Sequence, residues 1–399
     1  MQIHPPFAIS KRSSFLIGTV LSLISINSTA QDSIQGKNDF KDTGRIWGYV
    51  FGDYAYKLHA DAEKRGNIQY SRLPQNYNSF NIRRVYIGYD YQFSPNISSQ
   101  FVLAHESGSE ANEGNRDELT NKHRGVYIKT MNIRFKNVIP HATIVAGQQA
   151  RPTPSFSTSG DPIWGYRSIE KSITDLRGIS STNDLGIGII GKIGKNENVG
   201  YDLMVGNNNK AKLENNNFKK LYTSLYGYFL NKKLLIHGNY ENGTATTEPV
   251  RKNLSTIKGL IAYKSKQTTV AVEVFQQWQT NNSAFLRGFD TAYANGKSSG
   301  ISFYVTQKLK KDQLKSFARF DLYDPDTQYN SDNHYIGFYN IHKECFAVIG
   351  LDWIPYKNVH IMPNFWCDQF KSKFTSTSVK QKNDYDLAAR ITLYFLFDR

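Results

Sequence analysis

Apolar and polar residues alternate with a period of two along much of the chain. Residues 80–93 show this most clearly, because every second residue from Val85 onward is apolar and those between them are mostly polar or small. Residues 385–397 alternate in the same way and end on Phe397. Successive side chains of a strand point to opposite faces, so each segment predicts a strand with one apolar face.

Short and long polar connections alternate between the predicted strands. The short ones are 94–96, 137–140, 195–198, 231–233, 264–267, 310–313 and 355–358. The long ones are 107–121, 151–182, 207–217, 242–252, 280–297, 324–340 and 371–383. Tight turns at one end and long loops at the other are typical of an up-and-down barrel in an outer membrane. A sandwich with crossover connections would not keep this alternation.

These connections leave room for about sixteen strands, an even number and the size class that encloses an aqueous channel. We therefore predict an all-β fold, a transmembrane antiparallel up-and-down β-barrel, with the short turns and both chain ends in the periplasm. The last strand resembles the C-terminal signal for barrel insertion, although Asp398 and Arg399 follow the final aromatic residue.

The N-terminal segment is typical of a secretory signal peptide. Lys11 and Arg12 precede an apolar run at 15–26, and small residues lead to Ala30. The run is about a dozen residues long, whereas a spanning helix needs roughly 20. We predict a signal peptide at 1–30, a short periplasmic segment at 31–42 and the barrel at 43–399.

Composition narrows the class of protein without deciding it. The mean hydropathy is −0.52, yet the chain holds 25 Tyr and 24 Phe. A wide barrel with a polar lumen and aromatic girdles has this composition, and so does a large soluble β protein. The net charge of +15 is spread along the chain, which excludes the compact basic run of a nucleic-acid binder. It indicates either solvated loops or a positive lumen that concentrates anions.

Several motifs, in their order along the chain, resemble the phosphate-selective porin O and P family, particularly its forms in Bacteroidetes outer membranes. They are R-R at 83–84 with Y-I-G-Y at 86–89, G-Q-Q at 147–149 before R-P-T-P at 151–154, W-G-Y-R at 164–167, R-F-D-L-Y-D-P at 319–325 and the aromatic end at 394–397. The resemblance covers nearly the whole mature chain. It implies a sixteen-stranded homotrimeric porin whose third outer loop folds inward as a constriction and which passes anions such as phosphate.

The longest loop, at 151–182, matches the family's constriction loop by position. Its acidic residues are Asp161, Glu170 and Asp175, and its cations are Arg151, Arg167, Lys171 and Arg177. Guanidinium groups bind oxyanions with a planar fork, so this loop is a candidate anion guide. The alternative is internal pairing, in which Arg167 or Lys171 binds Glu170 or Asp175.

Strand alternation gives a second set of candidate anion-guiding residues. It places Arg84, Lys258, Arg319 and Arg390 on faces opposite apolar neighbours. A charge on the lipid face costs about 2–4 kcal/mol near the midplane, so we expect these four side chains to face the lumen.

Other functions leave different traces in the sequence. No G-x-S-x-G and no glycine-rich phosphate loop occurs, so we predict no enzyme, no cofactor and no metal site. A sugar, oligosaccharide or general-diffusion porin remains an alternative, as does a surface glycan-binding or adhesion barrel. The aromatic residues that sugars could stack on are Trp47, Trp164, Trp278, Trp353 and Trp366. We expect outer-membrane lipid and small solutes as partners.

The two cysteines, Cys345 and Cys367, are equally far in sequence from Tyr356 in a predicted turn. With that register they face each other, and cross-strand Cβ atoms about 4.5–5.5 Å apart are slightly too distant for a relaxed disulfide. The oxidising periplasm permits a bond. The sequence therefore predicts a facing pair that is either a disulfide or two free thiols.

Overall fold

The computed structural model describes residues 40–66, 69–106, 125–152, 171–180, 182–210, 212–214, 216–246, 248–330, 332–335, 342–373 and 383–398. The predicted signal peptide at 1–30 lies outside these residues. Asp42–Arg399 form one compact unit. No helix in the described part of the chain is long and apolar enough to cross a membrane.

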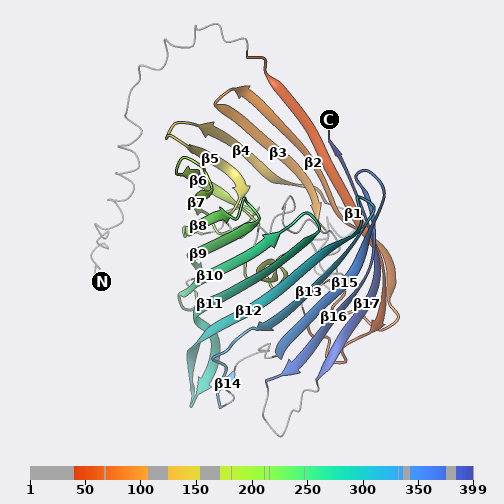
Figure 1. Cartoon of the computed structure of the whole chain (residues 1–399). Helices are drawn as coiled ribbons and strands as arrows, with labels where there is room; N and C mark the ends of the chain where they lie inside the picture. Colours follow the sequence, from red (N-terminus) through yellow and green to blue (C-terminus); the bar gives the residue numbers. More distant parts are fainter. Residues whose placement is uncertain are drawn as a thin grey trace, which may run out of the picture. The chain divides into compact units, whose positions relative to one another are not determined.

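Sixteen long strands form a closed antiparallel ring (Figure 1). Neighbours in the ring are neighbours in the chain, and β1 pairs with both β2 and β17, which closes it. The strands are β1 (Thr43–His59), β2 (Asn78–Ser94), β3 (Ile97–Glu106), β4 (Tyr127–Lys136), β5 (Ala142–Ala150), β6 (Asn183–Ile193), β7 (Val199–Gly206), β8 (Lys220–Phe229), β9 (Leu234–Thr246), β10 (Lys252–Lys264), β11 (Thr268–Arg287), β12 (Asp290–Lys310), β13 (Leu314–Asp324), β15 (His342–Tyr356), β16 (Val359–Ser372) and β17 (Asp384–Asp398). The two-residue strand β14 (His334–Tyr335) pairs with β11.

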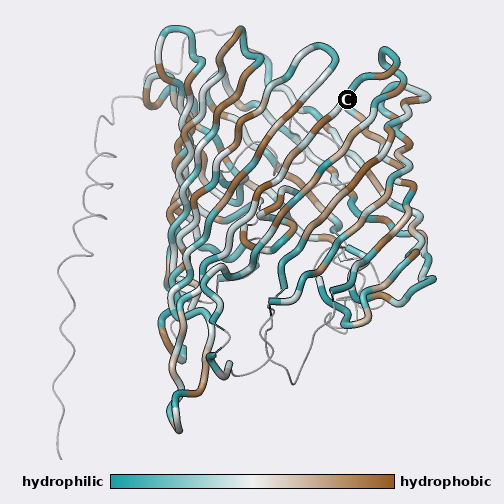
Figure 2. Tube along the Cα trace, turned by 60° about the horizontal axis from the view of Figure 1, so that its bottom comes forward, coloured by the Kyte–Doolittle hydropathy of each residue, from teal (hydrophilic) through white to brown (hydrophobic). Residues whose placement is uncertain are grey.

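Burial alternates along the wall strands as the sequence predicts. In β17 the outward residues Ile391, Leu393 and Phe395 are exposed, and Thr392 and Tyr394 between them are buried. Figure 2 shows the same alternation as brown and teal positions along the strands of the wall. One face of each strand is therefore apolar and points outward, and the other faces the barrel interior, as in the predicted up-and-down barrel.

The alternation of short and long connections is confirmed, but two of the long connections are shorter than predicted. The predicted long loop at 280–297 is a hairpin, because β11 and β12 continue past the rest of the sheet and pair up to Arg287 and Asp290. Gly288 turns the chain there with φ +65°. The extension has no lipid face, so its sequence lacks the apolar alternation that marks wall strands. The predicted loop at 242–252 is likewise shorter, because β9 continues to Thr246.

A β-bulge at Arg83 changes the alternation in β2. Arg84 lies opposite Phe51 on β1, and Ile82 lies opposite Gly52. The extra residue shifts the pattern by one position. Both Arg83 and Arg84 are therefore buried on the interior side.

The predicted cysteine pairing is wrong. Cys345 lies opposite Gln369, and Cys367 lies opposite Ala347, so the two cysteines are diagonal rather than facing. The turn between β15 and β16 is centred beyond Tyr356, which moves the register. Both cysteines are free thiols.

Candidate functional site

The longest loop, residues 151–182, is the third outer loop when 60–77 is counted as the first. Its described part lies inside the barrel, as predicted (Figure 1). Its described part contains the short helix α2 (Ile173–Leu176), which Ser172 caps by accepting a hydrogen bond from the Asp175 backbone N–H. The side chains of Ile173 and Leu176 are buried. Gly300 on β12 leaves room for Ile173, because a Cβ there would come within 2.8 Å of its Cδ1 atom. The loop starts at β5 and ends at β6, so this contact lies far around the ring, across the lumen (Figure 1).

Two cation contacts hold the helix against β13 and β15. Arg319 NH1 donates to the Lys171 backbone oxygen at 2.5 Å. Arg177 Nε lies 2.5 Å from Glu344 Oε2. Burial disfavours the charged form of Arg177, but the carboxyl groups of Glu344, Asp368 and Asp321 together outweigh it and hold the pKa of Arg177 above its ordinary value.

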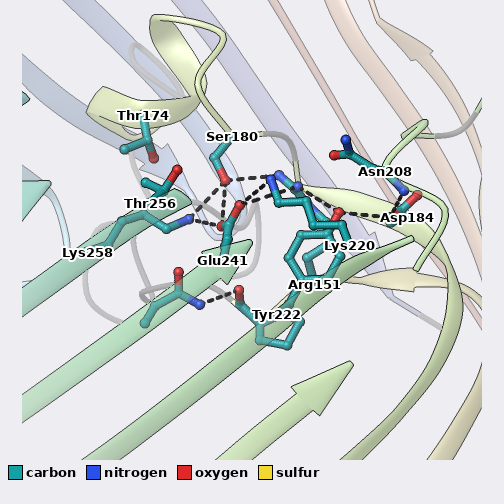
Figure 3. A network of polar contacts seen from close by, with 12 residues as sticks. Arg151, Thr174, Ser180, Asp184, Asn208, Lys220, Tyr222, Glu241, Thr256 and Lys258 are labelled. Atoms are coloured by element: carbon teal, nitrogen blue, oxygen red, sulfur yellow. Dashed lines mark hydrogen bonds and ion pairs between the residues drawn. The ribbon is translucent and has the colours of Figure 1, made fainter. Parts of the chain in front are cut away.

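The two ends of the loop meet the wall at a cluster of charges around Glu241 on β9 (Figure 3). Ser180 Oγ donates to Glu241 Oε1 at 2.8 Å, and Lys258 also contacts this oxygen. Lys220 Nζ lies 2.8 Å and Arg151 NH1 lies 3.8 Å from Oε2. Three cations, from β8, β10 and the loop, therefore share this one fully buried carboxylate.

A second carboxylate, Asp184 on β6, organises the neighbouring backbone. It accepts from Tyr222 Oη at 2.8 Å and from the Asn208 backbone N–H at 2.6 Å. Tyr222 in turn accepts from Arg151 NH1 at 3.2 Å. These contacts connect Arg151 through Tyr222 and Asp184 to Asn208, at the start of the next long loop.

All four strand cations that alternation placed inward are buried in the interior, and each contacts a carboxylate. Arg84 lies 2.7 Å from Glu106, Arg319 lies 2.6 Å from Asp321, and Arg390 lies 3.3 Å from Asp53. Lys258 belongs to the cluster around Glu241. Their orientation agrees with the prediction, whereas their role as anion guides stays a prediction.

The alternative for the third loop is that its cations pair with its own acidic residues. Two of them pair with carboxylates of the wall instead. Arg151 and Arg177 pair with the wall carboxylates Glu241 and Glu344. Arg167 and Glu170 lie outside the described residues. The side chain of Lys171 is half-buried.

The described part of the first long connection, residues 60–66 and 69–77, also folds into the barrel, which the sequence analysis did not predict. Asp61, Arg65 and Tyr70 are each at most 4% exposed. Arg65 lies over the ring of Phe370 on β16, and the Tyr70 hydroxyl donates to Asp53 at 3.2 Å. Hydrogen bonds from Arg65 outweigh the burial of Asp61 and hold the pKa of Asp61 below its ordinary value.

This first loop binds the last strand as well as the first. The Asp61 backbone N–H donates to Asp386 at 2.8 Å, and that of Ala62 donates to Asp384 at 2.8 Å. Lys57 on β1 lies 2.7 Å from Asp386. The loop therefore straddles the junction of β1 and β17.

Sequence reasoning could have found some of the missed interior residues. Lys220 and Glu241 occupy inward positions of alternating strands, so the parity argument applied to Lys258 also reaches them. Arg83 was hidden by the bulge. Asp61, Arg65 and Tyr70 lie in a segment with no periodicity, which leaves no local signal of burial.

The short turns form a basic rim. They hold Glu197 and Asp312 as acids, against the six lysines Lys195, Lys232, Lys233, Lys266, Lys311 and Lys357. All six lysines are exposed. The described residues contain no group of three or more His, Cys, Asp or Glu that could hold a metal ion.

Solved structures show what this barrel resembles. The outer membrane channel DcaP of Acinetobacter baumannii is 12% identical with a TM-score of 0.62, covering 91% of this chain and 99% of its own. The anion-selective porin from Comamonas acidovorans is 10% identical with a TM-score of 0.59, covering 90% and 100%. OmpF of Salmonella typhi, solved with daunomycin, is 11% identical with a TM-score of 0.53, covering 89% and 97%.

The barrel has the fold of outer-membrane porins. No protein-family model matches the chain, and no curated protein matches it by sequence. At such low identity the likeness to porins concerns the fold. The narrower resemblance to phosphate-selective porins stays a prediction.

Proposed function

We propose that this chain is an outer-membrane porin through which small hydrophilic solutes diffuse passively, with a preference for anions such as phosphate. The porin fold, the alternating lipid-facing wall and the inward third loop support the channel. The signal-peptide pattern and the family resemblance support export to the outer membrane and a homotrimer.

The cluster around Glu241 carries the anion preference. Within the described part of the chain, Arg151, Lys220 and Lys258 all lie within 4 Å of the Glu241 carboxylate. The cluster lies where the third loop meets the wall, so its positive charge acts on the space that the loop narrows. An excess of fixed charge in a narrow, low-dielectric passage raises the local concentration of counter-ions.

The basic rim of the short turns supports the same preference. Its lysines are exposed to water, so each is screened beyond a Debye length of about 8 Å at physiological salt. They surround the mouth on the predicted periplasmic side. Anions leaving or entering there meet a positive potential.

The sugar-porin alternative finds less support in the interior. A sugar pathway needs accessible aromatic faces, but Trp366 is 4% exposed. The guanidinium of Arg390 covers its ring at 3.7 Å. Trp164 lies outside the described residues.

Reversal potentials in planar bilayers under a KCl gradient test the proposal. We expect the reversal potential to lie closer to the equilibrium potential of chloride than to that of potassium. Adding phosphate should reduce the chloride current. A strong preference for potassium would contradict the anion preference, and an absence of channels from folded, heat-modifiable protein would contradict the porin function.

The basic rim gives a second, sharper measurement. Replacing Lys232, Lys233, Lys266 and Lys311 by Gln should lower the chloride-to-potassium permeability ratio about twofold, with a larger effect at low salt. Replacing Lys219, an exposed lysine near the long-loop end of β8, is the control and should leave the ratio unchanged. Equal effects of both changes would show that the rim has no special role.

A further inference from the structure

A pocket of about 640 Å³ opens on the outward face of β12, β13, β15 and β16. Its outward position follows from Leu322, which is 45% exposed beside the buried Asp321. Ile301, Leu322 and Cys345 provide an apolar lining, and Asp324, Lys343 and Lys371 provide a charged one. The charged residues lie at the long-loop ends of their strands. The pocket is therefore apolar toward the bilayer and basic toward the outer surface.

The lysines of this pocket form an unbalanced group. Lys343 and Lys371 lie directly opposite each other on β15 and β16, and both are exposed. Like charges in facing positions destabilise a sheet. Asp324 contacts Lys343 at 3.3 Å and Lys373 at 2.7 Å, so two ammonium groups already share this carboxylate. Lys371, opposite Lys343, adds a third positive charge beside them. An anion from outside the chain would complete the group.

We propose that this pocket binds a phosphorylated lipid of the outer leaflet. The phosphate lies between Lys343 and Lys371, and an acyl chain lies against Ile301 and Leu322. Ammonium groups bind phosphate by charge-assisted hydrogen bonds, and the volume lies in the range of ordinary ligand pockets. The proposal rests on the outer-membrane placement in the proposed function, but it requires no conduction.

A second outward pocket shows why the charge matters. It has about 680 Å³ and lies on β7 to β10, with Leu203, Leu225, Phe229, Ile236 and Ile257 among its lining residues. Its outward-facing lining carries no charged side chain. It offers no group that fixes a phosphate, so we assign no lipid to it.

Cys345 provides a reporter inside the proposed pocket. The variant Cys367→Ala keeps Cys345 as the one thiol, and Cys345→Ala keeps Cys367, which does not line the pocket. Alkylation by a maleimide is followed in detergent with and without bisphosphorylated lipid A. At a lipid concentration roughly ten times Kd we expect Cys345 to react about tenfold more slowly, and Cys367 to be nearly unaffected.

The lysine pair is then removed in the Cys367→Ala background. Lys343→Gln with Lys371→Gln should abolish most of the protection, whereas Lys219→Gln should retain it. Equal protection of both cysteines, equal protection by uncharged phosphatidylcholine, or protection that survives loss of both lysines would each overturn the proposal. Protection removed by inorganic phosphate at the lipid's own concentration would reassign the lysines to free anions.

Lipid binding and anion conduction are tested independently of each other. Both lysines face outward, so Lys343→Gln with Lys371→Gln should leave the reversal potential unchanged. A protein without channel activity could still show lipid protection of Cys345, and an anion-selective porin could lack it.

Discussion

At the scale of single residues, the interior is built from carboxylates that each hold several polar partners. Glu241 joins two wall strands and the third loop. Asp53 contacts Arg390, Arg83 and the hydroxyl of Thr392. Removing one partner from such a buried group leaves an uncompensated charge, which costs about 3–5 kcal/mol. These carboxylates therefore both stabilise the loops and set the local field.

Replacing Glu241 by Gln tests both roles together. The substitution keeps the shape of the side chain but leaves Arg151, Lys220 and Lys258 without their shared carboxylate. We expect a higher chloride-to-potassium permeability ratio in bilayer recordings and a free energy of unfolding lower by about 3–5 kcal/mol. Urea unfolding followed by tryptophan fluorescence measures the second quantity.

Glu248 supplies the matched control, because it is exposed in the loop that follows β9. Glu248→Gln should change the unfolding free energy by no more than about 0.5 kcal/mol. If Glu241→Gln left the permeability ratio where the control leaves it, the cluster would not contribute to selectivity.

At the scale of elements, two loops fill the barrel from different sides. The helix of the third loop packs against β12, β13 and β15. The first loop packs against β1, β16 and β17. If solutes pass through the barrel as we propose, both loops border their path, and the first loop lines the pore as the third does.

Tyr70→Ala should enlarge the pore. Tyr70 holds the first loop by its hydrogen bond to Asp53 and by edge contact with the ring of Trp366, whose centroid is 6.5 Å away. Losing a buried aromatic side chain costs about 3–5 kcal/mol, enough to release the loop locally. We expect a higher single-channel conductance and faster swelling of liposomes in larger sugars.

Tyr77→Ala is the control within the same loop. The hydrogen bonds of Tyr77 to Lys57 and Pro74 are made by its backbone, and the substitution keeps them. It should leave the conductance unchanged. An unchanged conductance in Tyr70→Ala, with normal folding, would show that the first loop does not limit the pore.

Sequence and structure agree best where a signal is local. Period-two alternation and tight turns are properties of neighbouring residues, so strands such as β2 and β17 and the short–long order of connections could be predicted. The partners of Arg177 and Arg319 come from distant strands, and a single sequence does not contain that register. The hairpin at 280–297 breaks the alternation, and the prediction of a loop failed there. The bulge at Arg83 adds a second buried arginine that the alternation alone does not indicate.

At the scale of the whole molecule, the outward faces of the strands form an apolar surface, which the proposed placement in a bilayer requires. Ile391 lies midway along β17 and is 47% exposed, whereas Leu309 lies beside a short turn and is 55% exposed. If the bilayer covers the wall as we propose, the cost of a charge must depend on depth.

We therefore expect Ile391→Arg to lower the free energy of unfolding in phospholipid vesicles by about 2–4 kcal/mol and Leu309→Arg by about 0–1 kcal/mol. Urea titrations in thin and thick bilayers measure both. Equal costs at the two positions would argue against this placement of the barrel in the membrane.

The attachment of the first loop to β17 has a consequence for assembly. The loop is made early in the chain, yet its contacts with Asp384 and Asp386 exist only once the last strand has arrived. The first loop can therefore dock only after β1 and β17 have paired, and its contacts then stabilise that pairing. To part β1 from β17, the backbone ladder and these side-chain contacts must break together. If solutes pass through the barrel as we propose, this junction stays closed toward the bilayer, and passage is confined to the barrel axis.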